Sequence, residues 1–166
     1  MRKILVTSFD SWQREQDLNS SGQLLDIVAQ THGDELFFLR NLPVETAAAT
    51  EMVLAAIKTH NPKAILCCGM AASRPDLSLE PQAISEARER LANPLDLNAF
   101  IKGLFNTSVS DDAGDFVCNA VYYNLLNHLK ATNDPTPCLF VHVPLLTDDN
   151  RAQVQTDFEK MLQNIA

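Results

Sequence analysis

The stretch Ala64-Ile65-Leu66-Cys67-Cys68-Gly69-Met70 decides the fold that this sequence predicts. Uncharged, mostly apolar residues in an unbroken short run are typical of a strand that is buried on both faces of a sheet. Successive side chains of a strand point to opposite faces, so we expect Cys67 and Cys68 to lie on opposite sides of the sheet. A strand covered on both faces belongs in the interior of a sheet, and we expect this one to be central.

Further strands and helices alternate on both sides of residues 64–70. Helices are expected where apolar residues recur every three or four positions, and strands where the apolar run is short and continuous. A weaker strand is expected at residues 78–86, followed by a less regular segment at residues 87–112 that contains one helix at residues 97–105. The alternation predicts an α/β fold, a three-layer αβα sandwich with a largely parallel central sheet. We expect strands at residues 3–8, 35–42 and 138–143, and helices at residues 46–60, 116–130, 150–165 and from a cap at Ser20 or Ser21 to residue 31.

Length and composition limit the classes of protein to which the chain can belong. Its 166 residues leave room for one domain, residues 1–166, and 46% of them are hydrophobic. There are 13 basic and 21 acidic residues, a net charge of −8, which disfavours nucleic acid as a partner. No apolar stretch reaches the length of a membrane span. The four cysteines lack the CxxC spacing of metal sites, so we expect reduced thiols and a cytoplasmic location.

Cys118 is the first candidate for chemistry, because it falls in the first turn of the helix predicted at residues 116–130. Unpaired backbone N–H groups and the helix dipole favour a thiolate there, and the same groups can stabilise an oxyanion. Three neighbouring acids, Asp111, Asp112 and Asp115, would oppose ionisation if they pointed inward. A cysteine early in a helix is also often only a small buried apolar residue, and this alternative stays open.

His142 and Glu80 are the second and third candidates. His142 interrupts an apolar strand near its carboxyl end, so its imidazole needs a polar partner. Glu80 follows a strand-like stretch, where a solvated surface carboxylate is the ordinary alternative. A cysteine nucleophile needs an imidazole to take its proton, and the imidazole needs an acceptor on its other nitrogen. Composition and periodicity do not show whether these three residues meet.

Several motifs along nearly the whole chain resemble those of the pyroglutamyl peptidase I family of cysteine peptidases. The segment Ala113-Gly114-Asp115-Phe116-Val117-Cys118-Asn119 closely matches the family's cysteine motif, and Phe140-Val141-His142-Val143-Pro144 matches its histidine motif. Gly69 to Arg74 is similar to the Gly-x-Ala-x-Gly-Arg motif, after which the family places its glutamate. Weaker similarities lie at residues 3–10, 19–21 and 42–44.

The resemblance implies an activity and a role for each matching residue. The family removes an N-terminal pyroglutamyl residue from peptides, without a metal or other cofactor. Cys118 would be the nucleophile, His142 the general base and then acid, and Glu80 the group that orients the imidazole. The resemblance further implies an oxyanion contact from Arg90 and substrate-binding roles for Phe9 and Trp12, with ordinary core packing as the alternative for these two aromatic residues. It also implies a phosphorylase/hydrolase-like fold, and homo-oligomers stay open because family members are typically tetramers.

The sequence departs from the family in two places that matter for substrate binding. Ser11-Trp12-Gln13-Arg14 stands where the family has Pro-Phe-Gly-Gly, and residues 91–112 form a much shorter segment than in typical members. A catalytically inactive or re-purposed homologue that binds a peptide end or a small molecule is therefore the alternative function. A nucleotide-binding domain is a poor third hypothesis, because the loop at residues 9–19 contains no glycine and so neither GxGxxG nor a P-loop.

Overall fold

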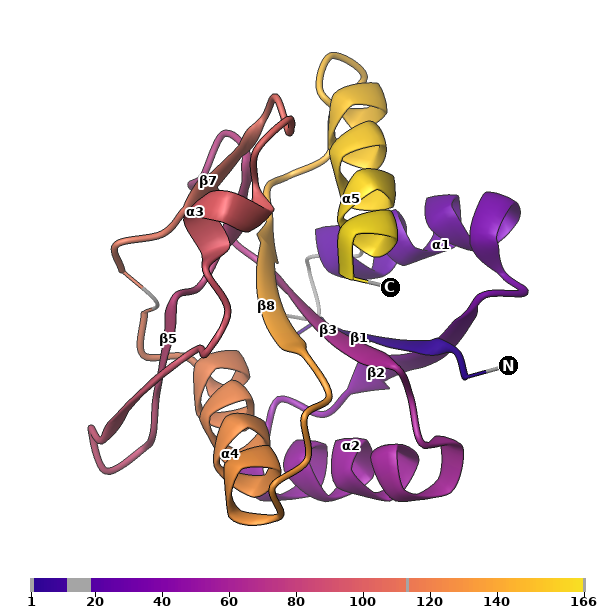
Figure 1. The fold of residues 1–166 in the computed structure, drawn as a ribbon. Helices are drawn as coiled ribbons and strands as arrows, with labels where there is room; N and C mark the ends of the chain where they lie inside the picture. The colour runs from indigo at the N-terminus through magenta and orange to yellow at the C-terminus, as the bar shows by residue number, and fades with distance from the viewer. Residues whose placement is uncertain (1, 12–18, 113, 166) are drawn as a thin grey trace.

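A six-stranded sheet forms the middle layer of the protein in the computed structural model, which describes residues 2–11, 19–112 and 114–165 (Figure 1). Strand β8 runs antiparallel to β4, and every other neighbouring pair is parallel. Residues 64–70 form β3, with two strands on one side and three on the other, so the expectation of a central strand is confirmed. The order across the sheet is β2 (Leu36–Leu42), β1 (Ile4–Phe9), β3 (Ala64–Met70), β8 (Cys138–Val143), β4 (Leu77–Leu79) and β7 (Thr107–Val109).

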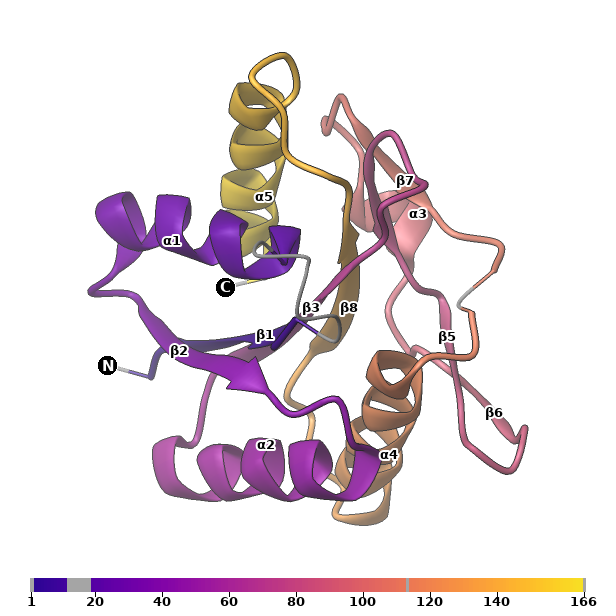
Figure 2. The same cartoon turned by 180° about the vertical axis from the view of Figure 1, so that it is seen from behind.

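Helices cover both faces of the sheet, which confirms the predicted three-layer α/β architecture. Helices α1 (Ser20–His32) and α5 (Arg151–Ile165) lie on one face, and α2 (Thr46–His60) and α4 (Val117–Ala131) lie on the other (Figures 1 and 2). Each face has its own buried core, and alternate residues of each strand contribute to opposite cores. Cys68 belongs to the core under α1 and α5, and Cys67 to the core under α2 and α4, as the alternation predicts.

The start of α1 differs in detail from the expectation, whereas the ends of α2 do not. Asn19, not Ser20 or Ser21, caps α1: its backbone is extended, and its side-chain oxygen accepts a hydrogen bond from the Ser21 backbone N–H at 3.0 Å. Both serines are buried inside the helix, where the Ser20 hydroxyl donates to the Val143 carbonyl at 3.1 Å. Helix α2 begins and ends at the predicted residues, and Asn61 closes it in the left-handed region with φ of 44°.

The connection between β4 and α4 differs most from the prediction. The expected single strand at residues 78–86 is two strands, β4 and β5 (Gln82–Ile84), which Glu80 and Pro81 separate. The helix expected at residues 97–105 is the single turn α3 (Leu97–Phe100), and Gly103, with φ of +87°, follows it. Strands β6 (Arg90–Ala92) and β7 were not predicted, because three residues are too few to reveal alternation.

The hairpin of β5 and β6 leaves the main sheet and lies against α4, so this connection builds one border of the region around Cys118 (Figure 2). None of the helices in residues 2–11, 19–112 and 114–165 is long and apolar enough to cross a membrane.

Candidate active site

A buried hydrogen bond joins two of the three candidate residues. His142 Nδ1 lies 2.6 Å from Glu80 Oε1, and their side chains are 5% and 0% exposed. The backbone places the pair: Ser78 of β4 is opposite His142 of β8, and the Glu80 N–H donates to the Phe140 carbonyl at 3.0 Å. With Nδ1 hydrogen-bonded to the carboxylate, a neutral imidazole keeps its other nitrogen, Nε2, as a proton acceptor.

Cys118 lies on the same face of the sheet as His142. It is the second residue of α4, and α4 covers the face toward which Phe140 and, two residues later, His142 point. Gly69 of β3 is the register partner of His142, and a Cβ added to Gly69 would lie 3.6 Å from the Cβ of Cys118. The thiol therefore sits over the carboxyl end of β3, next to the strand that carries the imidazole. Parallel α/β sheets place their functional sites at this edge.

Burial dominates the electrostatics of Cys118. Loss of water raises the pKa of the Cys118 thiol to about 12, and the negative charge of Glu80 adds to this rise. The backbone N–H groups of Asn119 and Cys118 lower the pKa, as expected at a helix N-terminus, but they do not outweigh burial. The thiol is therefore neutral in the free protein at neutral pH, so it would act as a nucleophile only with a neighbouring base to accept its proton.

The aspartates near Cys118 have partners of their own. Asp112 accepts a hydrogen bond from the Gly114 backbone N–H at 2.9 Å, and Asp115 forms an ion pair with Arg88 at the surface. The acid that acts on the thiol is Glu80, which lies far from Cys118 in the sequence.

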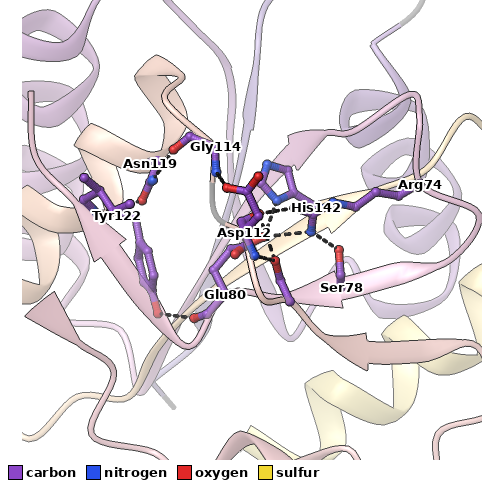
Figure 3. Close-up of polar contacts among 10 residues, drawn as sticks. Arg74, Ser78, Glu80, Asp112, Gly114, Asn119, Tyr122 and His142 are labelled. Carbon is purple, nitrogen blue, oxygen red and sulfur yellow. Dashed lines mark hydrogen bonds and ion pairs between the residues drawn. The ribbon is translucent and has the colours of Figure 1, made fainter. Parts of the chain in front are cut away.

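Arg74 is a site residue that sequence reasoning missed. Its Nη1 donates to Glu80 Oε1 at 2.8 Å and also to the Ser78 hydroxyl, and its Nη2 donates to the Asp112 carbonyl at 2.5 Å (Figure 3). The side chain is 25% exposed, so it reaches Glu80 from the rim of the site. The signal was its place at the end of the motif that precedes Glu80, six residues before the carboxylate.

Arg90 and Phe9, two other predicted site residues, make no hydrogen bond or ion pair with Cys118, His142 or Glu80 in the described part of the chain. Arg90 is exposed on β6, opposite Ile84, and makes no side-chain hydrogen bond or ion pair within the described part of the chain. Ile84 donates its backbone N–H to the side chain of Asn119 at 3.0 Å, so the strand pair approaches the residue after Cys118. Phe9 is 6% exposed and packs in the core under α2 and α4. Trp12 lies outside the described residues.

The surface has two hollows, and they differ in whether they border the first turn of α4, which carries Cys118. A hollow of about 230 Å³ flanks the first turn of α4 and is bordered by Thr46, Ile84, Arg88, Phe116 and Val117, among others. A larger groove of about 1020 Å³ lies between α2 and α4. Cys118, His142 and Glu80 line neither hollow, but the smaller one is bordered by Val117, the residue before Cys118. The smaller hollow is therefore the better candidate for a binding pocket. In the described ranges, no three His, Cys, Asp or Glu side chains lie close enough to hold a metal ion.

Comparison with known proteins identifies the family. The family model described as pyroglutamyl peptidase matches residues 2–100 and 95–163. The chain belongs to the pyroglutamyl peptidase family. The match to this family of cysteine peptidases is divided at residues 95–100, inside the segment that the sequence indicated to be shortened.

Relatives and solved structures agree with the pyroglutamyl peptidase assignment. The chain is 27% identical to a pyrrolidone-carboxylate peptidase of Bacillus cytotoxicus (89% of this chain, 80% of the relative) and 29% identical to pyrrolidone-carboxylate peptidase 1 of Caldanaerobacter subterraneus (88% and 84%). Its fold is similar to that of pyroglutamyl peptidase I from Bacillus amyloliquefaciens (TM-score 0.82, 18% identity, 98% of this chain, 94% of the other). The pyrrolidone carboxyl peptidase of Thermococcus litoralis gives a TM-score of 0.82 at 19% identity (99% and 93%).

Proposed function

We propose that this pyroglutamyl peptidase family member is a cysteine exopeptidase that removes an N-terminal pyroglutamyl residue from peptides, using Cys118, His142 and Glu80 as a triad. The observation that carries the proposal is the buried 2.6 Å hydrogen bond between His142 and Glu80, on the face of the sheet that the first turn of α4 covers. A buried imidazole fixed by a carboxylate is the arrangement that activates a neighbouring thiol.

The reaction begins from a neutral thiol. As the sulfur of Cys118 attacks the pyroglutamyl carbonyl, its proton passes to Nε2 of His142, and Glu80 stabilises the imidazolium. The carbonyl oxygen becomes an oxyanion beside the N-terminus of α4, where the N–H group of Cys118 is the candidate donor, because the Asn119 N–H already donates to the Phe116 carbonyl at 3.0 Å. His142 then gives its proton to the leaving amine, which leaves a thioester on Cys118. Water, deprotonated by His142, hydrolyses the thioester and releases pyroglutamate.

The hollow beside the first turn of α4 is our candidate pocket for the pyroglutamyl ring. At about 230 Å³ it lies below the range of pockets that hold drug-sized ligands, which suits a single small residue. Pyroglutamate is uncharged at its blocked amino group, so the lactam needs no counter-ion. Phe116 and Val117 supply apolar surface there, and Arg90 remains a candidate oxyanion contact. The four free cysteines support a cytoplasmic location.

The proposal is tested by release of a fluorogenic amine from a pyroglutamyl amide. We expect turnover by the wild type and a loss of about 10⁴-fold or more in Cys118→Ala, because removal of the nucleophile leaves only binding and oxyanion contributions. Cys68→Ala is the matched control, since its thiol lies on the opposite face of the sheet. A prolyl amide, which carries a charged ring nitrogen, should be a much poorer substrate.

The alternative of a catalytically inactive or re-purposed homologue predicts a different result. Absence of turnover with pyroglutamyl and other N-acyl amides, by wild-type protein that is folded by circular dichroism, would contradict the proposal and favour that alternative. Equal turnover by Cys118→Ala and the wild type would contradict the assignment of the nucleophile.

A further inference from the structure

Arg74 connects the two halves of the candidate site. One guanidinium nitrogen, Nη1, binds the carboxylate of Glu80 at 2.8 Å, and the other, Nη2, binds the backbone carbonyl of Asp112 at 2.5 Å (Figure 3). Glu80 holds His142, while Asp112 belongs to the loop that leads into α4 and Cys118. The rigid, planar fork of an arginine is suited to holding two such acceptors in fixed relative positions.

The hydrogen bonds continue from Asp112 to the helix that carries the thiol. The Asp112 carboxylate accepts from the Gly114 N–H at 2.9 Å, and the Gly114 carbonyl accepts from the Asn119 side chain at 2.7 Å. Asn119 directly follows Cys118 in the first turn of α4 and is 1% exposed. Gly114 adopts φ of +67°, a conformation that favours glycine. The backbone therefore turns at the residue that links Asp112 to Asn119 by hydrogen bonds.

A second contact joins α4 to the Glu80 segment without passing through Arg74. The Tyr122 hydroxyl donates to the Glu80 backbone carbonyl at 3.3 Å, and Tyr122 is buried beneath the helix. This contact holds the Glu80 backbone but does not touch its carboxylate. The direction of the carboxylate therefore depends on His142 and Arg74, which both bind the same oxygen, Oε1.

Charge is the other contribution of Arg74. Glu80 is completely buried, and an ionised carboxylate in such a place needs a nearby cation or several donors. In the described part of the chain, Arg74 is the one cationic side chain that forms a salt bridge with Glu80, apart from the histidine itself. Without Arg74, the Glu80 carboxylate would be free to turn away from His142, and the orientation of the imidazole would be lost.

We propose that Arg74 is a positioning residue, which keeps the Glu80 carboxylate directed at His142 and fixes the loop before Cys118 relative to that pair. The proposal rests on the proposed function for its kinetic consequence. It makes no claim that Arg74 touches the substrate. Loss of Arg74 should therefore reduce kcat and leave KM nearly unchanged, because the substrate contacts remain while the reacting groups are misplaced.

The test compares Arg74→Met with Arg74→Lys and with a matched control, Arg40→Met. Arg40 also donates to one carboxylate, that of Asp26, and to one backbone carbonyl, that of Leu25, but it joins β2 to α1. For Arg74→Met we expect kcat to fall about 100-fold with KM changed less than threefold, as for a displacement of reacting groups by about 1 Å. Arg74→Lys keeps the charge and should recover part of the loss. Arg40→Met should match the wild type.

A spectroscopic measurement tests the same proposal without activity. In protein with isotope-labelled histidine, the Nδ1 proton that His142 shares with Glu80 should give a downfield signal that His142→Gln abolishes. We expect the signal in the wild type, Arg40→Met and Arg74→Lys, and not in Arg74→Met. An unchanged signal in folded Arg74→Met, or a kcat equal to that of Arg40→Met, would overturn the proposal. Failure of the wild type to turn over any pyroglutamyl amide would instead count against the proposed function, and the signal would still decide the role of Arg74.

Discussion

Two carboxylates are completely buried in the part of the chain that the structure describes, Glu80 and Asp157, and their surroundings differ. Asp157 of α5 uses both oxygens: it accepts hydrogen bonds from the backbone N–H groups of Phe105 and Asn106 at 3.1 and 2.7 Å, and from the Thr107 hydroxyl at 2.9 Å. All three donors are uncharged. Glu80 accepts from His142 and Arg74 at Oε1 alone, and Oε2 has no hydrogen-bond partner among the described residues.

The difference separates a structural acid from a candidate catalytic one. The donors around Asp157 anchor the start of β7 to α5, and no titratable side chain takes part. The partners of Glu80 are an imidazole that can gain a proton and an arginine at the rim of the site. Incompletely satisfied buried groups with titratable neighbours are concentrated at functional sites, because their energetic cost is kept only where it serves a purpose.

The comparison predicts its largest effect for Glu80→Gln. Glutamine keeps the size of the side chain but removes the charge that stabilises the imidazolium and selects its tautomer, so kcat/KM should fall about 10⁴-fold. Hydrolysis of the fluorogenic pyroglutamyl amide measures the loss. A fall of less than tenfold would mean that Glu80, like Asp157, has only a structural role.

A second effect concerns the reactivity of Cys118. Since its thiol has a pKa raised to about 12, alkylation by iodoacetamide should keep rising up to pH 10, whereas in denaturant it should level off near pH 9. At pH 8.5 the native thiol should react about a thousandfold more slowly than the denatured one. A plateau at neutral pH in the native protein would contradict the raised pKa. Cys118→Ser gives the background, and Asp157→Asn should behave like the wild type.

The same pKa fixes the direction of a stability effect. Above about pH 8.5 the unfolded chain releases the Cys118 proton while the folded protein retains it. The free energy of unfolding should therefore fall as pH rises from 8.5 toward 12, and fall less in Cys118→Ala. Equal slopes in urea titrations of the two proteins across this range would show that Cys118 is not responsible.

Asp157→Asn should produce the opposite pattern to Glu80→Gln. The amide cannot accept three hydrogen bonds as well as the carboxylate does, so we expect a loss of about 2 kcal/mol in the free energy of unfolding. Because Asp157 touches no candidate catalytic residue, kcat/KM of the folded fraction should stay within about twofold of the wild type. Urea denaturation and the amide assay together measure both. An unchanged stability, or a large loss of activity, would remove the contrast between the two acids.

The smallest effect is expected for Ser78→Ala. It removes one uncharged acceptor of Arg74, a contact worth about 0.5–1 kcal/mol, so kcat should fall about two- to fivefold. Ser108→Ala is the matched control, since Ser108 pairs with Ser78 on the neighbouring strand β7 but is exposed. If both variants equal the wild type, Ser78 does not help to hold Arg74.

Local features of this protein could be predicted from the sequence, and features that depend on contacts between distant residues could not. The long strands and helices were predictable because apolar runs and helical spacing are local signals, and Cys118 and His142 stand within them. The place of Arg74 in a motif did not reveal what it binds, and Asp157 gave no signal, because both roles come from contacts with residues distant in sequence, such as Asp157 with the turn before β7. The short strands β6 and β7 likewise depend on tertiary pairing.

Activation of Cys118 by His142, in a pocket for pyroglutamate, can be tested by labelling with pyroglutamyl chloromethyl ketone followed by peptide mapping. We expect one label per chain on Cys118, slowed by excess pyroglutamyl amide and nearly lost in His142→Ala, with Cys67, Cys68 and Cys138 unmodified. Labelling that spares Cys118, or that neither the competing amide nor the loss of His142 affects, would contradict it.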